Sequence, residues 1–220
     1  MFWCDWGAIP RIERAGMDGS TRRIIVKDEV RWPNGLTIDL ALDKLYWVDA
    51  KLHTIGSSNL DGSGATTVLF STRHLRHPFS ISVFSHLVFW TEWGTHAIYQ
   101  ANKFTGANIS AITNTHSVGG TPTIYSVTLY PYSPQIHLPM VVQVYHPYRQ
   151  PDYPNHCLPF NGFCSHFCLP VPAVQPEVIR TVCKCPQIMY MGKDNRTCRK
   201  GGKFFCHAIH TVKTQKPNKY

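Results

Sequence analysis

Six cysteines crowd a short stretch of this 220-residue sequence and offer its clearest chemistry. They follow the pattern C-x6-C-x3-C-x14-C-x-C-x12-C between Cys157 and Cys198. Thiols at this density are typical of a small module that is stapled by disulfides in an oxidising compartment. The alternative is structural zinc, which favours paired C-x2–4-C ligands that total four. Because this pattern offers one wide pair and one C-x-C, it favours disulfides over zinc.

Acidic side chains that follow tryptophans are the second set with chemistry to offer. The motifs Phe2-Trp3-Cys4-Asp5, Tyr46-Trp47-Val48-Asp49 and Phe89-Trp90-Thr91-Glu92 place their tryptophans 44 and then 43 residues apart. The glycines of three predicted turns keep nearly the same step, 43 and then 44 residues, at Gly19, Gly62 and Gly106. Two markers in register at such a period are typical of propeller blades.

The motif has a packing reason. Alternate residues of a strand face opposite sides, so Trp47 and Asp49 share one face of their sheet and Tyr46 lies on the other. Both faces carry bulky side chains, which suits sheets that pack face to face. We interpret the recurrent carboxylates, including Asp5 and Glu92, as acceptors of backbone hydrogen bonds rather than as catalytic groups.

Each period divides into four predicted strands, and no window carries a long amphipathic helix. In the clearest repeat the strands are expected at residues 36–39, 44–49, 54–60 and 66–70. The Asp61-Gly62 step between the last two is a strong hairpin signal. The predicted fold class is therefore all-β, with a partial propeller of about three blades.

The third period is longer than the others. The prolines that mark the innermost strands, Pro33, Pro78 and Pro139, are 45 and then 61 residues apart. We expect the excess to form an extruded loop at 118–135 with a short strand at 123–129, either as a binding loop or as an inert insertion. Since closed propellers normally have four to eight blades, an open arc that is prone to association is expected.

These motifs and their order resemble the YWTD β-propeller of the low-density lipoprotein receptor family, in which an epidermal growth factor-like module follows the propeller. Segments such as Trp32-Pro33-Asn34-Gly35 and His77-Pro78-Phe79-Ser80 are also similar to family segments. The sequence departs from the family pattern at Cys4, Val48 and Glu92. The resemblance implies an incomplete propeller over residues 1–151, an epidermal growth factor-like module over 152–200 and a flexible basic tail over 201–220.

The resemblance also implies the disulfide pairing within the module. The implied pairs are Cys157 with Cys168, Cys164 with Cys183, and Cys185 with Cys198, and they leave Cys4 and Cys206 outside the framework. The segment 152–156 lacks the acidic cluster that calcium-binding members carry before the first cysteine. No cofactor is therefore predicted, with calcium as the remaining alternative.

As to function, the resemblance implies a non-catalytic extracellular segment of an endocytic receptor, acting as a ligand-binding or scaffold part. Its implied partners are lipoproteins, yolk proteins or Wnt-pathway proteins, with acid-dependent release in endosomes. Because imidazole titrates near endosomal pH, His53, His77 and His86 are candidate pH sensors, although ordinary surface or turn positions are the alternative. Asn108 and Asn195 begin glycosylation sequons, which agree with a secretory route.

Other function classes receive less support. The net charge of +9 arises mainly from residues 193–220, which hold eight basic side chains against one acid, so nucleic-acid binding is not indicated. A propeller hydrolase would cluster carboxylates and asparagines on its inner strands, but only one of these strands offers such residues, Asn34 and Asp39. A truncated product or decoy without independent function is a further alternative.

The sequence shows neither a signal peptide nor an apolar run of the ~18 residues that a membrane span needs. Any membrane contact is expected only through parts of a parent receptor outside this sequence.

Overall fold

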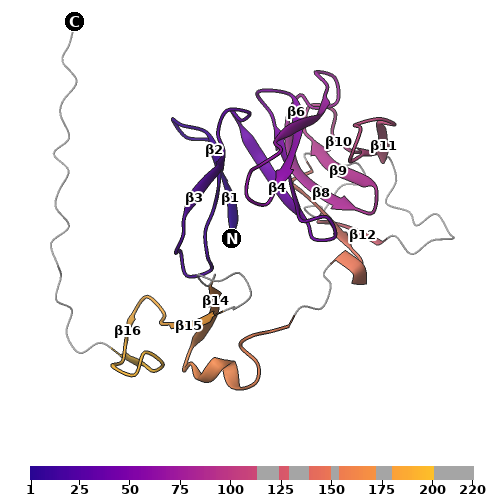
Figure 1. Ribbon diagram of the computed structural model, residues 1–220. Helices are drawn as coiled ribbons and strands as arrows, with labels where there is room; N and C mark the ends of the chain where they lie inside the picture. Colours follow the sequence, from indigo (N-terminus) through magenta and orange to yellow (C-terminus); the bar gives the residue numbers. More distant parts are fainter. Residues whose placement is uncertain (113–123, 129–138, 150–153, 172–179, 201–220) are drawn as a thin grey trace, which may run out of the picture. The chain divides into compact units, whose positions relative to one another are not determined.

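The computed structural model describes residues 1–112, 124–128, 139–149, 154–171 and 180–200. The chain divides into two compact units, Met1–Pro154 and Asn155–Tyr220 (Figure 1). In the described part, the only helices are two 3-10 turns, Pro147–Arg149 and Phe160–Phe163, and the rest of the regular structure is strand. The all-β prediction is therefore confirmed. None of the helices in this part of the chain has the length and hydropathy that a transmembrane segment requires.

Most of unit 1 consists of three successive antiparallel sheets. Their strands are β1 (Phe2–Asp5), β2 (Arg11–Arg14) and β3 (Arg23–Val26) in sheet 1; β4 (Pro33–Asp39), β5 (Lys44–Asp49), β6 (Thr54–Asn59) and β7 (Thr66–Phe70) in sheet 2; and β8 (Pro78–Phe84), β9 (Leu87–Glu92), β10 (Ala97–Asn102) and β11 (Ser110–Ile112) in sheet 3. Figure 1 shows sheets 2 and 3 side by side, with the innermost strands β4 and β8 as neighbours. Each sheet corresponds to one predicted blade.

The last strands of unit 1 form a separate pair. Strand β13 (Val141–Tyr145) packs beside β8. Its hydrogen-bonded neighbour is β12 (Ile124–Thr128), which lies within the strand expected at 123–129. The remainder of the 118–135 loop, the tail at 201–220 and Cys206 lie outside the described residues.

The observed strand boundaries differ slightly from those expected. Strand β4 begins at Pro33 rather than at residue 36, because Pro33 already pairs with Asp49 before a bulge that shifts the register at Gly35. Strand β6 ends at Asn59, where the amide of Gly62 donates to the Asn59 carbonyl at 2.9 Å and closes the hairpin turn.

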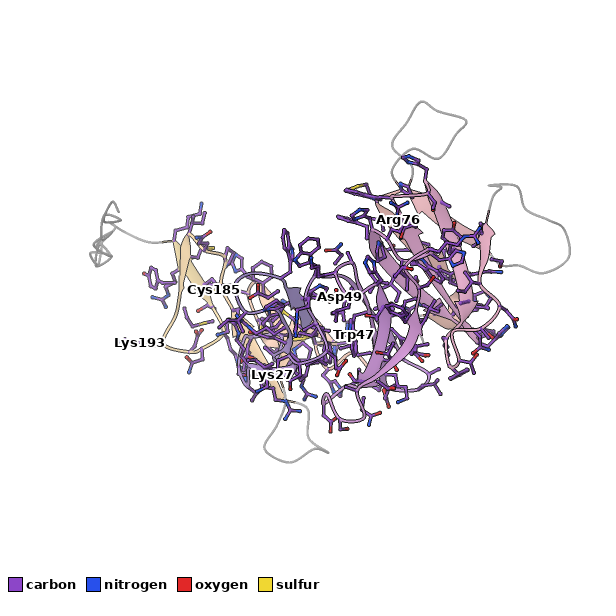
Figure 2. The ribbon with its side chains drawn as sticks, turned by 90° about the horizontal axis from the view of Figure 1, so that it is seen from above. Lys27, Trp47, Asp49, Arg76, Cys185 and Lys193 are labelled. Carbon is purple, nitrogen blue, oxygen red and sulfur yellow. A yellow bond between two sulfur atoms is a disulfide. The ribbon has the colours of Figure 1, made fainter. Side chains whose placement is uncertain are left out.

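Side chains of alternating direction fill two different cores. Trp47, labelled in Figure 2, packs with Ile12 and Val26 between sheets 1 and 2. Its neighbour Tyr46 points the other way and packs with Trp90 between sheets 2 and 3. The strand alternation predicted from the sequence is thus what joins one sheet to the next.

Turn glycines bring neighbouring sheets into close backbone contact. A Cβ atom on Gly62 would lie 2.1 Å from the carbonyl oxygen of Ile25 on β3, and one on Gly106 would lie 2.5 Å from that of Val68 on β7. Gly62 also has a φ of +92°, which side chains other than glycine adopt at a cost. The 43-residue step of the glycines therefore records a repeated contact between sheets.

A buried ion pair joins sheets 2 and 3 at the same end of their strands as the turn glycines Gly62 and Gly106. Lys103, which follows β10, donates its ammonium to the carboxylate of Asp39 at the end of β4. The two residues are 3% and 6% exposed, so removal of either partner would leave a buried charge unpaired. The amide of Lys103 also donates to the carbonyl of His86 at 2.9 Å, which fixes this loop against the β8–β9 turn.

Unit 2 contains two short hairpins and three disulfides. Strand β14 (Phe167–Val171) pairs with β15 (Arg180–Lys184), and β16 (Met189–Met191) pairs with β17 (Cys198–Lys200). The disulfides are Cys157–Cys168, Cys164–Cys183 and Cys185–Cys198, the same pairs that the resemblance implies. Cys168 and Cys183 face each other across β14 and β15, yet each is bonded to a different cysteine. Cys4 is a free thiol in unit 1.

The contact at Gly62 yields a matched test of how the sheets are joined. Gly62 and Gly19 occupy the same turn position, with φ of +92° and +84°, but no atom lies within 4 Å of a Cβ built on Gly19. We expect Gly19→Ala to lower the free energy of unfolding by ~1 kcal/mol through its backbone conformation alone. Gly62→Ala should lower it by a further ~1–3 kcal/mol, because the methyl group meets the Ile25 carbonyl. Urea unfolding monitored by tryptophan fluorescence measures both, and equal losses would contradict the contact.

Candidate functional site

The carboxylate of Asp49 gathers four backbone amides from two loops. One oxygen accepts from the amides of Arg31 and Trp32 at 2.6 and 3.0 Å, and the other accepts from those of Lys51 and Leu52 at 2.9 and 2.8 Å. The side chain is fully buried. Because charge-assisted hydrogen bonds replace the water that the carboxylate loses, Asp49 fixes the loop before β4 against the turn after β5.

Glu92 has the corresponding role in sheet 3 with a longer side chain. Both of its oxygens accept from the amide of His77, at 2.9 and 3.1 Å, and one also accepts from the amide of Gly94 at 2.8 Å. Glutamate thus holds two backbone donors where Asp49 holds four. The extra methylene preserves the link between the loop before β8 and the turn after β9, but with fewer bonds.

Asp5, the first acid of the series, has a different environment. It accepts from the amide of Gly7 at 2.9 Å and forms an ion pair with Arg11 at 2.9 Å. Its side chain is 37% exposed, in contrast to the other two acids. The neighbouring Glu13 is buried, and hydrogen bonds from Arg22 and Arg11 lower the pKa of its carboxyl.

The tryptophans of the motif also differ in their partners. The indole nitrogen of Trp90 donates to the carbonyl of His74 at 2.8 Å. That of Trp47 is buried without a hydrogen-bond partner, and its ring lies where a Cβ on Gly56 would be 2.3 Å away. Trp3 lies under the guanidinium of Arg22, 5.2 Å from the ring centroid.

A pocket of about 390 Å³ lies where the loops held by Asp49 and Glu92 meet. Its lining comes from the loop before β4, the turn after β5 and the loop before β8. The lining residues are Trp32, Ala50, Lys51, His53, Thr72, Arg76 and His77. Figure 2 labels Asp49 and Arg76, which mark the buried anchor and the exposed cation of this region. The recurrent acids therefore position the pocket without lining it.

Nitrogen-bearing side chains dominate the pocket, and no carboxylate is among its lining residues. The ammonium of Lys51 lies 5.1 Å from the ring centroid of Trp32, which orients both side chains. The Nδ1 atom of His53 lies 2.7 Å from the carbonyl oxygen of Leu75, so the neutral ring carries its proton there. Such a set can bind an anionic group beside an aromatic wall.

The structure brings together two of the three candidate pH sensors. His53 and His77 line the same pocket, whereas His86 lies in the exposed β8–β9 turn and contacts Ser85 instead. Their sequence positions had suggested no difference among the three.

Trp32, Lys51 and Arg76 are site residues to which the sequence alone assigned no role. Each is adjacent to a recognised marker: Trp32 precedes an inner-strand proline, Lys51 follows the motif acid by two residues, and Arg76 precedes His77. The sequence therefore contained markers beside all three residues. Only the fold shows that residues from two different repeats line one pocket.

Two other features bear on the chemistry of unit 1. A larger cavity of about 560 Å³ runs along the inner strands, and Arg149 lines it, but this guanidinium already donates to the Thr37 hydroxyl at 2.8 Å.

Cys4 occupies a threonine position of the motif, and burial, followed by the charge of Asp49, raises the pKa of its thiol to about 12. In the described residues, no three side chains of histidine, cysteine, aspartate or glutamate converge as metal ligands.

Comparison with known families shows which repeat family the chain resembles. The model of the low-density lipoprotein receptor repeat class B matches residues 1–40 and 43–85, which span sheets 1 and 2 and the start of sheet 3. The first two repeats of the chain are therefore class B repeats of the low-density lipoprotein receptor family. The match contains two of the three aromatic–tryptophan motifs and the loops that carry Trp32, Lys51 and His77.

Two similar curated proteins are receptors. The chain is 36% identical over 198 residues to the vitellogenin receptor Yl of Drosophila melanogaster, and 32% identical over 199 residues to the vitellogenin receptor of Solenopsis invicta. Each alignment covers 90% of this chain but only 9% and 10% of the relative, so the chain spans about a tenth of their length. A crystal structure of a nidogen/laminin complex is 28% identical, with a TM-score of 0.44, over 49% of this chain and 41% of that chain.

The unequal bonding of the two acids predicts unequal losses on neutralisation. Asp49→Asn replaces one acceptor oxygen by a donor that faces backbone amides, and it should lower the free energy of unfolding by ~2–4 kcal/mol. Glu92→Gln disturbs fewer donors and should cost ~1–2 kcal/mol. The exposed Asp43→Asn is the control, with an expected change within about 0.5 kcal/mol. Chemical denaturation measures the order, and a smaller loss for Asp49→Asn than for Glu92→Gln would contradict it.

Proposed function

We propose that this chain is an extracellular, non-catalytic segment of a receptor that binds acidic segments of protein ligands at the pocket between sheets 2 and 3. The observation that carries the proposal is the pocket itself, with Lys51 and Arg76 beside Trp32 and no carboxylate in its lining. The names of the two curated relatives point to a ligand of the vitellogenin class.

The chemistry of the pocket defines what it recognises. Lysine and arginine bind carboxylates, and the tryptophan ring offers apolar area beside them. The surrounding loops are anchored by buried acids, so the pocket is largely formed before the ligand arrives. A run of acidic residues with an adjacent apolar side chain fits these groups.

Acid should strengthen this interaction. The imidazoles of His53 and His77 line the same pocket as Lys51 and Arg76, and the buried carboxylates of Asp49 and Glu92 accept backbone hydrogen bonds. Protonation therefore makes the pocket more cationic as the pH falls through the range in which imidazole titrates. This direction is opposite to the acid-dependent release that the resemblance implies.

A secretory route is part of the proposal. Asn108 and Asn195 are both exposed and precede strands or turns at the surface of their units. We propose that these sequons carry glycans and that the parent receptor acts at the cell surface and in endosomes. Of the partner classes that the resemblance implies, vitellogenin-type ligands have the support of the relatives' names, and no feature of the pocket favours a Wnt-pathway protein.

A binding experiment with charge variants tests the site. The probes are a fluorescent peptide rich in aspartate and glutamate, and purified vitellogenin. Lys51→Ala/Arg76→Ala should weaken binding of both at neutral pH by roughly tenfold or more, since two charge-assisted contacts are lost. The control, Arg23→Ala/Lys27→Ala, removes the same charges at two exposed positions, one on β3 and one just after it. It should leave affinity within about twofold. Equal weakening by both pairs would refute the pocket as the site.

The pH dependence is tested separately. The wild-type chain should bind the acidic peptide about fivefold more tightly at endosomal than at neutral pH, equivalent to roughly 1 kcal/mol. His53→Asn/His77→Asn should abolish this gain, and asparagine retains a donor for the Leu75 carbonyl and tolerates the positive φ at position 53. His86→Asn is the control and should keep the gain. A gain that survives in the double variant would contradict the assignment of these histidines.

A further inference from the structure

An exposed apolar tip projects from unit 2 and has no role in the pocket of unit 1. Leu158, Phe160 and Phe163 are exposed for 68%, 75% and 66% of their surface, within six residues of chain. The rings of Phe160 and Phe163 stack with their centroids 6.0 Å apart. Large apolar side chains gathered in this way are typical of an interaction surface.

The tip is rigid. Cys157 and Cys164 flank it, and each is bonded to another cysteine of the module. The amide of Gly162 donates to the carbonyl of Cys157 at 2.7 Å, and the amide of Cys164 donates to the carbonyl of Asn161 at 3.0 Å. Insertion of such a tip into a partner therefore loses little conformational entropy.

The polar side chain of the tip is satisfied internally. The side-chain amide of Asn161 donates to the carbonyls of Cys164 and His166 at 2.9 and 2.7 Å. These bonds lower the desolvation cost of Asn161 when the neighbouring apolar side chains leave water.

A cation contacts the tip, and others lie close to it in the sequence. The guanidinium of Arg196 lies 5.7 Å from the ring centroid of Phe163, and the carbonyl of Arg196 accepts from the amide of Ser165 at 2.9 Å, which holds this segment beside the tip. Exposed Arg199 and Lys200 follow in the chain, and Lys193, labelled in Figure 2, precedes it. Asp194 is the only acid among the described residues of unit 2, and its carboxylate accepts from the backbone amides of Arg196 and Thr197 and from the Thr197 hydroxyl.

We propose that this tip of unit 2 is a membrane-contact site, in which Phe160, Phe163 and Leu158 insert into the interface of a bilayer and the adjacent cations bind anionic lipid headgroups. The combination of exposed apolar side chains with flanking arginine and lysine fits a bilayer surface, where the apolar groups meet the acyl boundary and the charges meet phosphates. A protein partner would need a pocket for two stacked phenylalanines, and the charge distribution does not specify one.

Vesicle sedimentation of the 220-residue chain tests the proposal. The probes are vesicles of phosphatidylcholine alone and of phosphatidylcholine with roughly 30% phosphatidylserine. The wild-type chain should sediment with the anionic vesicles, and more weakly with the neutral ones and at high salt. Phe160→Ser/Phe163→Ser should reduce the partition coefficient by roughly tenfold or more, since two aromatic rings no longer insert. Arg196→Gln should reduce it several-fold on anionic vesicles only.

The control is Phe70→Ser/Phe104→Ser, which removes two phenylalanines that are 64% and 57% exposed in unit 1. It should leave sedimentation unchanged. Mass spectrometry without reductant verifies that every variant retains its three disulfides, so a loss of binding reports the tip rather than misfolding. Absence of wild-type sedimentation, equal binding to neutral and anionic vesicles, or equal loss in the control would overturn the proposal. So would a tip variant that keeps its vesicle binding but loses affinity for vitellogenin, because the tip would then contact protein.

Discussion

The structure of unit 1 depends on carboxylates that are buried among backbone amides. A carboxylate out of contact with water is strongly unfavourable unless hydrogen bonds replace its hydration, and Asp49 satisfies this condition with four amides from two separate loops. The charge therefore fixes the relative position of segments that the strands alone would leave free. Glu92 repeats the arrangement in the next sheet with two donors. Because the pocket lies between these two anchored regions, the geometry of the candidate site follows directly from the structural acids.

Strand alternation and glycine turns also hold neighbouring sheets together. Tyr46 and Trp47 point into different cores, so sheet 2 is bound to both of its neighbours by a single motif. At the outer strands, the turn at Gly62 packs against the backbone of the preceding sheet, where any side chain would collide. These contacts recur with the sequence period, and they explain why the tryptophan and glycine markers stay in register.

Much of this could be predicted from the sequence, and the part that could not has a physical cause. The period near 43 residues, the four strands around Tyr46-Trp47-Val48-Asp49 and the structural use of the acids follow from local alternation and turn chemistry. The role of Lys51 and Arg76 does not, because the two residues come from different repeats and meet only when the sheets stack. The separation of His53 and His77 from His86 has the same cause, since the three are alike in sequence but lie at different ends of the strands. The consequence of glutamate at position 92 also required coordinates, because the number of donors that it reaches depends on loop geometry.

Amide hydrogen exchange of the wild-type chain, followed residue by residue by NMR, tests the central claim most directly. The amides of Trp32, Lys51 and Leu52 lie in loops, yet each donates to the buried carboxylate of Asp49. The account predicts that these three amides exchange as slowly as those in the centre of β5, because they are released only when the sheets separate. Exchange at the rate of an unprotected loop, with β5 still protected, would show that the carboxylate does not hold these segments together.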